Sequence, residues 1–328
     1  MSRSFLIIQT AFIGDVILAT ALIESLKLKY PDAAVDIIVR RGNEPLLVNH
    51  PLLREVITFD KRNKYRNLIR LIRKIRRNRY DVAINVQRFA TTGIVTVCSR
   101  ARETVGFDKN PLSFLFDRKI GHQQEGVHEV QRNHNLIRHL VSEPVARPRL
   151  YPTKEQFEKV ANFGGGAYVT VSPASVWFTK QHAVDKWLEF LKAIPTHFRV
   201  YLLGAPGDQP LCDKLRESSN NHMVTTLAGT LTLLESAALM SRAVMNYVND
   251  SAPMHLASAL NAPVTAVYCS TVPEFGFGPL SDRSYVIQIN DPLPCRPCGL
   301  HGFRACPEGH FRCSHGISVT QLLGTLTA

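Results

Sequence analysis

The stretch IIQTAFIGDVILATALIESL, residues 7–26, decides the fold class of this protein. Its start belongs to the apolar run FLIIQ, which predicts a buried strand, and its apolar residues from about residue 15 recur at helical spacing. Gly14 supplies a permissive turn between the two elements, and Asp15 lies at the helix start. A carboxylate there accepts backbone N–H groups, so a plain helix cap accounts for Asp15. An ionised Asp15 at the carboxyl end of a strand could also act as a general base.

Short apolar strands alternate with helical patterns along the whole chain. The segment at 142–154, SEPVARPRLYPTK, contains three prolines and little hydrophobic pattern, so it predicts a linker or a domain edge. A chain of 328 residues also exceeds the length that one hydrophobic core usually reaches. The sequence therefore predicts an α/β protein with two doubly wound domains, residues 1–150 and 151–328. After FLIIQ, strands are expected at 35–39, 55–59, 81–86, 167–172, 198–204, 223–229, 243–248 and 263–269, and helices at 61–79 and near 183–194, 208–219, 231–242 and 252–260.

The composition is that of a water-soluble globular protein, with 45% hydrophobic and 20% charged residues and no apolar segment of membrane-spanning length. The N-terminus imitates a secretory signal because Arg3 precedes an apolar run, but Gln9 and Asp15 interrupt that run. The seven cysteines, four of them crowded near the C-terminus, do not resemble the disulfide framework of a secreted domain. We therefore expect a cytoplasmic protein.

The net charge of +12 predicts attraction to polyanions such as nucleic acid, anionic lipid, or a phosphorylated or carboxylated substrate. Residues 61–79, KRNKYRNLIRLIRKIRRNR, contain ten Lys or Arg and no acid. Helical spacing there predicts an amphipathic helix with a basic face, its apolar side formed by Tyr65, Leu68, Ile72 and Ile75. A solvated face on a core-packed helix accounts for this pattern, and a role against an anion or a membrane surface is the alternative.

A second candidate site is MNYVNDSAPMHLASALNAP, residues 245–263, where a predicted strand ends in a polar turn and enters a helix. Ligands of doubly wound sheets bind beyond the carboxyl ends of the strands. Asn249, Asp250 and Ser251 are all capping residues, and the free N–H groups of a helix N-terminus bind phosphates. His255 falls on the first turn of that helix, within reach of the same ligand, although a packed or surface histidine is the plain alternative.

A third loop, VSPASVWFTKQHAVDKW at 171–187, also follows a predicted strand. Its hydroxyl groups belong to Ser172, Ser175 and Thr179. Lys180 offers a point charge suited to a diphosphate, or is an ordinary surface lysine.

A fourth loop, LLGAPGDQP at 202–210, places Asp208 at a helix start, where it caps the helix or binds ribose hydroxyls. Other nucleotide motifs are missing from the sequence. It contains no GxxxxGK[ST] and no complete GxGxxG after a strand, and the glycines at 164–166 precede their strand. P-loop and nicotinamide chemistry are therefore disfavoured.

Nine segments stand in one order along the chain: IGDVILATALIESLKLKYPDA, RYDVAINVQ, VGFDK, HEVQRN, SPASVWFTKQHAVDKW, LLGAP, LAGTLTLLESAALMSRA, VNDSAPMHLASAL and FGPL. Most are weak individually, but in this order they resemble glycosyltransferase family 9, the bacterial lipopolysaccharide heptosyltransferases. The resemblance implies a GT-B fold, in which two Rossmann-like domains face each other across a cleft. Residues 1–150 would then bind the acceptor, and residues 151–328 the nucleotide sugar.

The resemblance also implies an inverting transfer of heptose from ADP-L-glycero-β-D-manno-heptose to the inner core of lipopolysaccharide, a lipid A acceptor that bears Kdo or heptose. Asp15 is implied as the catalytic base, and Lys180 as the group that stabilises the departing diphosphate. No metal and no other cofactor is required, and no nucleic-acid partner is expected. The implied donor contacts are Ser175 beside Lys180, Asp208 near the ribose, Leu231 in the adenine pocket, and Asp250, Ser251 and His255 at the phosphate end.

An anionic acceptor would explain the basic N-terminal half, with expected contacts at Arg62, Lys64, Arg88 and Arg132. We also expect peripheral contact with the anionic inner face of the cytoplasmic membrane. Two alternatives stay open: a different nucleotide sugar as donor, or a non-catalytic polyanion-binding protein on the same scaffold. Substrate detail is open as well, because the sequence departs from the usual family pattern at Ala21, at Gln181-His182 and at Ala252.

The cysteine-rich segment CRPCGLHGFRACPEGHFRC contains Cys295, Cys298, Cys306 and Cys313. Four thiolates could hold a structural zinc ion, but the spacing is irregular for the common zinc fingers. Reduced thiols or one disulfide are the favoured interpretation.

Overall fold

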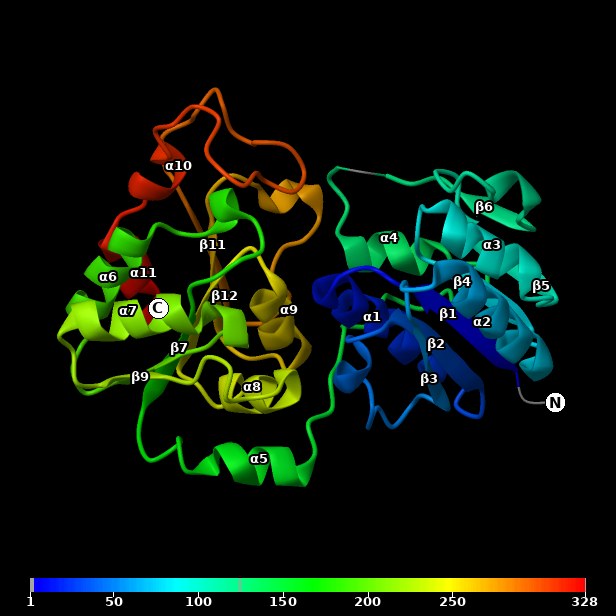
Figure 1. The fold of residues 1–328 in the computed structure, drawn as a ribbon, viewed down its shortest axis with the longest axis horizontal. Helices are drawn as coiled ribbons and strands as arrows, with labels where there is room; N and C mark the ends of the chain where they lie inside the picture. The colour runs from blue at the N-terminus through cyan, green and yellow to red at the C-terminus, as the bar shows by residue number, and fades with distance from the viewer. Residues whose placement is uncertain (1–2, 124, 328) are drawn as a thin grey trace. The chain divides into compact units, whose positions relative to one another are not determined.

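The computed structural model describes residues 3–123 and 125–327. The chain divides into two compact units, Met1–Tyr151 and Pro152–Ala328, each built on one six-stranded sheet (Figure 1). The division falls within the proline-containing segment 142–154, which has no helix or strand before residue 154. The predicted α/β class is confirmed.

The first unit contains a parallel sheet of order β3-β2-β1-β4-β5-β6. Its central strand β1 pairs with neighbours on both sides, Phe5 lying opposite Val35 and Val82. Residues 5–8 of β1 are fully buried, because both faces of a parallel sheet are covered by helices. The strands are β1 (Ser4–Gln9), β2 (Ala34–Arg40), β3 (Glu55–Phe59), β4 (Val82–Asn85), β5 (Glu103–Phe107) and β6 (Arg118–Ile120).

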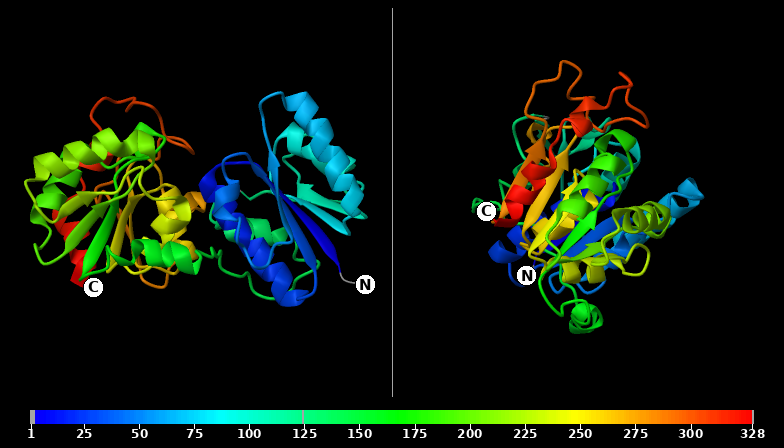
Figure 2. Two further views of the ribbon diagram at one scale, coloured as in Figure 1. Left: turned by 60° about the horizontal axis from the view of Figure 1, so that its bottom comes forward. Right: turned by 90° about the vertical axis from the view of Figure 1, so that its left-hand side faces the viewer.

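Helices cover both faces of this sheet (Figure 2). Crossovers between parallel strands are right-handed, so the helices on the two sides of the strand-order reversal between β1 and β4 cover opposite faces of the sheet. Accordingly, α1 packs against α4, and α2 packs against α3. The helices are α1 (Ile13–Lys29), α2 (Lys64–Asn78), α3 (Ala90–Cys98) and α4 (Glu129–Asn135), with short 3-10 turns η1 (Glu44–Leu46) and η2 (Ser113–Leu115).

The second unit repeats the same plan, with order β12-β11-β10-β7-β8-β9 and parallel pairing throughout. Its core includes the fully buried Trp187, Phe190 and Tyr247. The strands are β7 (Tyr168–Ser172), β8 (Arg199–Leu202), β9 (Val224–Thr226), β10 (Met245–Asn249), β11 (Val264–Tyr268) and β12 (Ser284–Gln288). The helices are α5 (Lys154–Ala161), α6 (Val184–Ala193), α7 (Gln209–Ser219), α8 (Leu233–Met240), α9 (Ala252–Ala259), α10 (Arg312–His315) and α11 (Val319–Thr327), with η3 (Phe178–Lys180), η4 (Pro206–Asp208) and η5 (Pro273–Phe275).

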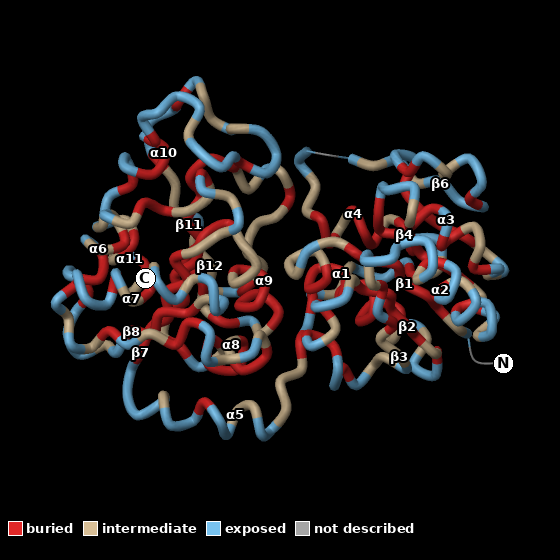
Figure 3. The backbone as a smooth tube through the Cα atoms, in the orientation of Figure 1, coloured by how far each residue is buried: buried red, intermediate tan, exposed pale blue. Residues whose placement is uncertain are grey.

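Burial is concentrated in the strands and the inner helix faces, and the loops that leave the strands are more exposed (Figure 3). Every strand expected from the sequence is present, and β5, β6 and β12 are additional. Within the described residues, no helix has both the length and the apolar character needed to cross a membrane.

Two local predictions are wrong. Gly14 is not a turn residue, because α1 already begins at Ile13 and Gly14 lies inside its first turn. Tyr65 is not on the buried side of α2, since its side chain is 79% exposed. The side that packs into the core is formed by Leu68, Leu71 and Ile75, which follow the i, i+3, i+7 spacing of one helix face.

Candidate active site

The carboxyl ends of three neighbouring strands in the second unit bring together Lys180, Asp250 and Thr271. Lys180 ends η3 after β7, Asp250 follows β10, and Thr271 follows β11. Lys180 Nζ lies 2.6 Å from Asp250 Oδ2, and Thr271 Oγ1 donates to the same oxygen over 2.7 Å. The side chains of Lys180 and Asp250 are 17% and 6% exposed, so the ion pair is largely withdrawn from water.

This cluster lies where the order of strands reverses, between β7 and β10. At such a switch point the connections on either side leave in opposite directions, which opens a crevice beyond the strand ends for a ligand. A nucleotide is the ligand that doubly wound sheets most often take there. The geometry therefore favours the second unit as a nucleotide-binding domain.

The polar turn after β10 does not cap helix α9 as the sequence predicted. Asn249 instead fastens the turn to the loop after β7: its side-chain amide donates to Pro173 O over 2.8 Å, and its Oδ1 accepts from His182 N over 2.8 Å. Asp250 turns to Lys180, and Ser251, at the N-cap position, makes no side-chain capping bond. In the described structure the first turn of α9 thus has no side-chain cap. Pro253 has no N–H and Met254 N donates to Ser251 O over 3.0 Å, so the N–H groups that can bind an anion here are those of Ser251 and Ala252.

The other predicted donor residues lie at the same edge of the sheet. Ser175 is half-buried in the loop after β7, and its carbonyl accepts from Gln181 Nε2 over 2.6 Å. Asp208 follows β8, where its Oδ2 accepts from Ala205 N over 2.8 Å. Leu231, half-buried, follows β9, and His255 is buried on the first turn of α9. The structure therefore gathers all the predicted donor residues beyond the ends of β7 to β10.

A C-terminal loop is hydrogen-bonded to Thr179, the residue that precedes Lys180. Phe303 N donates to Thr179 Oγ1 over 2.7 Å, and Thr179 N donates back to Phe303 O over 3.1 Å. Gly302 lies so close that a Cβ there would come within 2.8 Å of Thr179 Oγ1. The chain next to Lys180 is thus held by the cysteine-rich segment.

The cysteines of that segment are free thiols, as are the other three in the chain. In the described part of the chain, no group of three or more His, Cys, Asp and Glu side chains is arranged to hold a metal ion. Burial raises the pKa of the Cys313 thiol to about 11 and also raises that of Cys298, so these groups stay protonated at neutral pH. The segment acts here by packing and by backbone hydrogen bonds, such as Cys298 N to Ser270 O at 2.8 Å.

In the first unit, Asp15 is half-buried in the first turn of α1. The N-cap position belongs to Phe12, so Asp15 is not the capping residue. Gln9, at the end of β1, shapes this loop: its Oε1 accepts from Ala11 N over 3.2 Å and from the side-chain amide of Gln87, which follows β4. Asp15 therefore lies beside the strand-order reversal of its own sheet.

Of the four expected acceptor contacts, three are exposed and one is buried. Arg62, Lys64 and Arg88 are exposed, and Arg62 pairs with Asp60, whose pKa is held well below its usual range by that guanidinium. Arg132 is only 3% exposed and pairs with Glu129 over 2.8 Å inside the unit. The Arg132 side chain therefore forms an ion pair inside the first unit.

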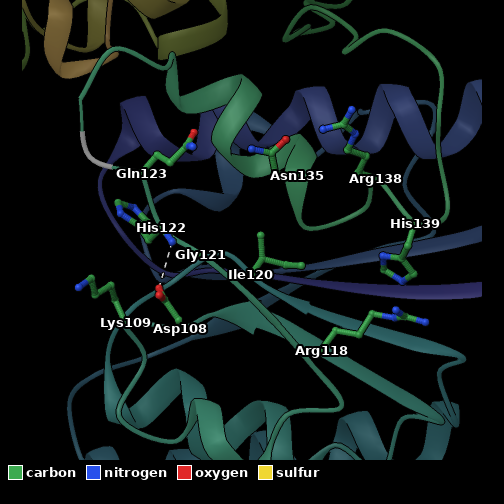
Figure 4. A pocket seen from close by; sticks show the side chains of 10 residues that line it. All are labelled: Asp108, Lys109, Arg118, Ile120, Gly121, His122, Gln123, Asn135, Arg138 and His139. Carbon is green, nitrogen blue, oxygen red and sulfur yellow. Dashed lines mark hydrogen bonds between the residues drawn. The ribbon is translucent and has the colours of Figure 1, made fainter.

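Sequence reasoning missed a basic pocket of about 690 Å³ in the first unit (Figure 4). It lies along the edge strand β6 and contains cationic side chains from three segments, with Arg118 on β6, Lys109 after β5 and Arg138 after α4. His122 N donates to Asp108 Oδ1 over 3.0 Å at one end. Asp108 and Lys109 belong to the VGFDK motif, which contributed to the family resemblance and gave no indication of a pocket. The full lining is Asp108, Lys109, Arg118, Ile120, Gly121, His122, Gln123, Asn135, Arg138 and His139.

Two Rossmann-like units, each with the doubly wound strand order, form the architecture of the GT-B fold. Residues 68–301 match the family model of glycosyltransferase family 9 (heptosyltransferase), so the chain belongs to that family. A curated relative is lipooligosaccharide heptosyltransferase 2 of Haemophilus influenzae, 26% identical over 318 residues that cover 87% of this chain and 88% of that protein.

Two solved structures from E. coli resemble the whole chain. ADP-heptose lps heptosyltransferase II superposes with a TM-score of 0.82 at 21% identity, covering 99% of this chain and 98% of that one. Heptosyltransferase WaaC with ADP superposes with a TM-score of 0.77 at 18% identity, covering 99% of both chains. At these identities the superpositions establish the fold.

Proposed function

We propose that this glycosyltransferase moves a heptose from ADP-L-glycero-β-D-manno-heptose to the inner core of lipopolysaccharide. The observation that carries the proposal is the meeting of Lys180 and Asp250 beside the first turn of α9, which no side chain in the described structure caps. The relative from Haemophilus influenzae is named for lipooligosaccharide heptosyl transfer, and the WaaC structure contains ADP. Both support an ADP-heptose donor and a lipopolysaccharide acceptor.

The second unit would hold the donor. Lys180, His255 and the N–H groups at the start of α9 would stabilise the diphosphate, with Ser175 beside Lys180 and Ser251 at the helix N-terminus. Asp208 would bind the ribose hydroxyls, and Leu231 would line the adenine pocket. These side chains all come from the carboxyl edge of one sheet, which supports a single extended nucleotide site.

The reaction would be a direct displacement with inversion. The acceptor oxygen attacks the anomeric carbon, the bond from that carbon to the β-phosphate oxygen breaks, and Asp15 takes the proton of the acceptor hydroxyl. The departing ADP carries the negative charge, which Lys180 and the helix N-terminus stabilise. Charge neutralisation by these groups needs no metal ion.

The first unit would bind the anionic acceptor. Arg62, Lys64 and Arg88 are exposed, and the pocket along β6 adds Lys109 and Arg138. The exposed face of α2 carries further basic residues, which would bring the protein to the anionic inner face of the cytoplasmic membrane.

The test is mass spectrometry of truncated lipopolysaccharide after incubation with ADP-heptose and, separately, with other nucleotide sugars. Asp15→Asn should lower kcat by about a hundredfold or more, the range of general-base catalysis. ADP affinity, measured by calorimetry, should stay within about twofold.

Asp32→Asn is the matched control, because Asp32 is an exposed acid just beyond the other end of α1. Unchanged turnover in Asp15→Asn would refute the base assignment. Transfer from a different nucleotide sugar alone would refute the donor. ADP binding without transfer of any sugar would favour a non-catalytic polyanion-binding protein.

A further inference from the structure

Thr271 has no assigned part in the transfer reaction, yet its hydroxyl meets the centre of the candidate site. Its side chain is 1% exposed, and Oγ1 donates to Asp250 Oδ2 over 2.7 Å. Lys180 Nζ approaches the same oxygen at 2.6 Å. We propose that Thr271 is a positioning residue that acts through Asp250 to keep Lys180 available to the donor diphosphate. The inference rests on the proposed role of Lys180.

The physical reason is the burial of Asp250. A carboxylate with 6% exposure needs hydrogen-bond donors, because a buried charge without a partner is costly. When Lys180 turns toward a diphosphate, it withdraws a proton donor from Asp250. The Thr271 hydroxyl stays behind as a donor to the same oxygen, so the carboxylate remains hydrogen-bonded. Without that hydroxyl, Asp250 would hold the lysine more tightly and oppose its transfer to the ligand.

Thr271 is suited to this role because its backbone is clamped. Arg296 Nη2 donates to Thr271 O over 2.8 Å, and Arg296 Nε donates to Cys269 O over 2.7 Å. The Arg296 guanidinium also donates to Gln288 Oε1 on β12 over 2.7 Å. On its other side the loop is tied to the lysine turn, because Ser270 N donates to Thr179 O over 3.2 Å. The hydroxyl is therefore held at a fixed distance from both Asp250 and the turn that ends in Lys180.

The test compares three substitutions on β11 and the loop that follows it. Thr271→Val keeps the shape and removes the hydroxyl, and it should lower kcat/KM for the donor by about tenfold, as expected for the loss of a hydrogen bond to a charged group. Thr271→Ser restores the hydroxyl and should stay within about twofold of wild type. Thr265→Val is the control: Thr265 is equally buried, but its hydroxyl donates to Thr325 Oγ1, so kcat/KM should not change by more than about twofold.

A double-mutant cycle with Lys180→Met separates positioning from simple structural damage. If Thr271 acts through the lysine, adding Thr271→Val to Lys180→Met should weaken ADP binding by less than about twofold, against several-fold in the wild-type background. Calorimetric ADP affinity is the readout, because it stays measurable when turnover is lost. Equal losses in both backgrounds would overturn the inference, and so would a Thr271→Val enzyme that matches wild type.

Failure of the proposed function has a different signature. If the wild-type protein neither binds ADP nor transfers heptose, the proposed function and the inference fall together. If the wild-type enzyme transfers heptose and Lys180→Met impairs it, while Thr271→Val behaves as Thr265→Val does, the inference alone falls.

Discussion

Replacing Lys180 by Met tests how much the buried ion pair contributes to the second unit. Methionine has a similar length and no charge, so the main change is that Asp250 loses its cation. Removing one partner of a buried pair costs about 3–5 kcal/mol. The low end applies here, because the Lys180 side chain is 17% exposed and Thr271 still donates to the carboxylate. We expect a loss of about 3 kcal/mol, or about 6–12 °C in Tm for a domain of this size.

Tryptophan fluorescence makes this measurement specific to the second unit. The two tryptophans of the chain, Trp177 and Trp187, both belong to that unit, and Trp187 is fully buried. The matched control is the double variant Lys180→Met with Asp250→Asn, which removes both charges. It should recover most of the loss, because an uncharged pair carries no penalty for an unpaired ion. A Tm for Lys180→Met within about 1 °C of wild type would contradict the reasoning.

Two further outcomes follow from the structure. Gly302→Ala should weaken ADP binding by several-fold in calorimetry, because its Cβ would approach Thr179 Oγ1 to 2.8 Å. Gly309→Ala is the control and should leave ADP binding unchanged, because Gly309 has a similar positive φ and its Cβ would meet nothing within 4 Å. Equal effects of the two substitutions would show that backbone strain alone is responsible. His182 is buried, and desolvation lowers its pKa to about 3. Below about pH 6.5 the unfolded chain therefore binds a proton at this histidine that the native protein does not bind. The free energy of unfolding consequently falls as the pH drops from about 6.5 towards 3. In urea denaturation, the loss of stability from pH 7 to pH 5 should be about 2 kcal/mol smaller in His182→Gln than in wild type, and identical pH dependence would refute this assignment.

Much of the fold could be read from local pattern. Residues 5–9 and 55–59 are short apolar runs in a chain where such runs alternate with segments of helical spacing. They form β1 and β3 with nearly the expected bounds. Elements with weaker patterns escaped prediction: β6 is three residues long and exposed or half-buried, so it has little hydrophobic signal. Tyr65 shows the opposite error, because helical spacing identifies a possible face and cannot say which residues the sheet covers.

The candidate site was predicted only in part. Polar residues after strand ends pointed to Lys180 and Asp250, since strand ends of a parallel sheet share one edge. Asn249 was expected to cap α9, but its side chain instead joins the loop after β10 to the loop after β7. This could not be predicted, because its partners, Pro173 and His182, are remote in sequence. Thr271 could not be predicted as a site residue, because a single threonine in a loop forms no recognisable sequence pattern.

The sequence by itself determined the alternation of strands and helices, the doubly wound α/β architecture and the family. These depend on local periodicity and on the order of short motifs. Only the tertiary structure decided which charges neutralise one another. It paired Asp250 with Lys180 and placed the Thr271 hydroxyl on the same carboxylate oxygen. Pairing of this kind depends on distances of about 3 Å between residues far apart in the chain, and local sequence pattern contains no information about such distances.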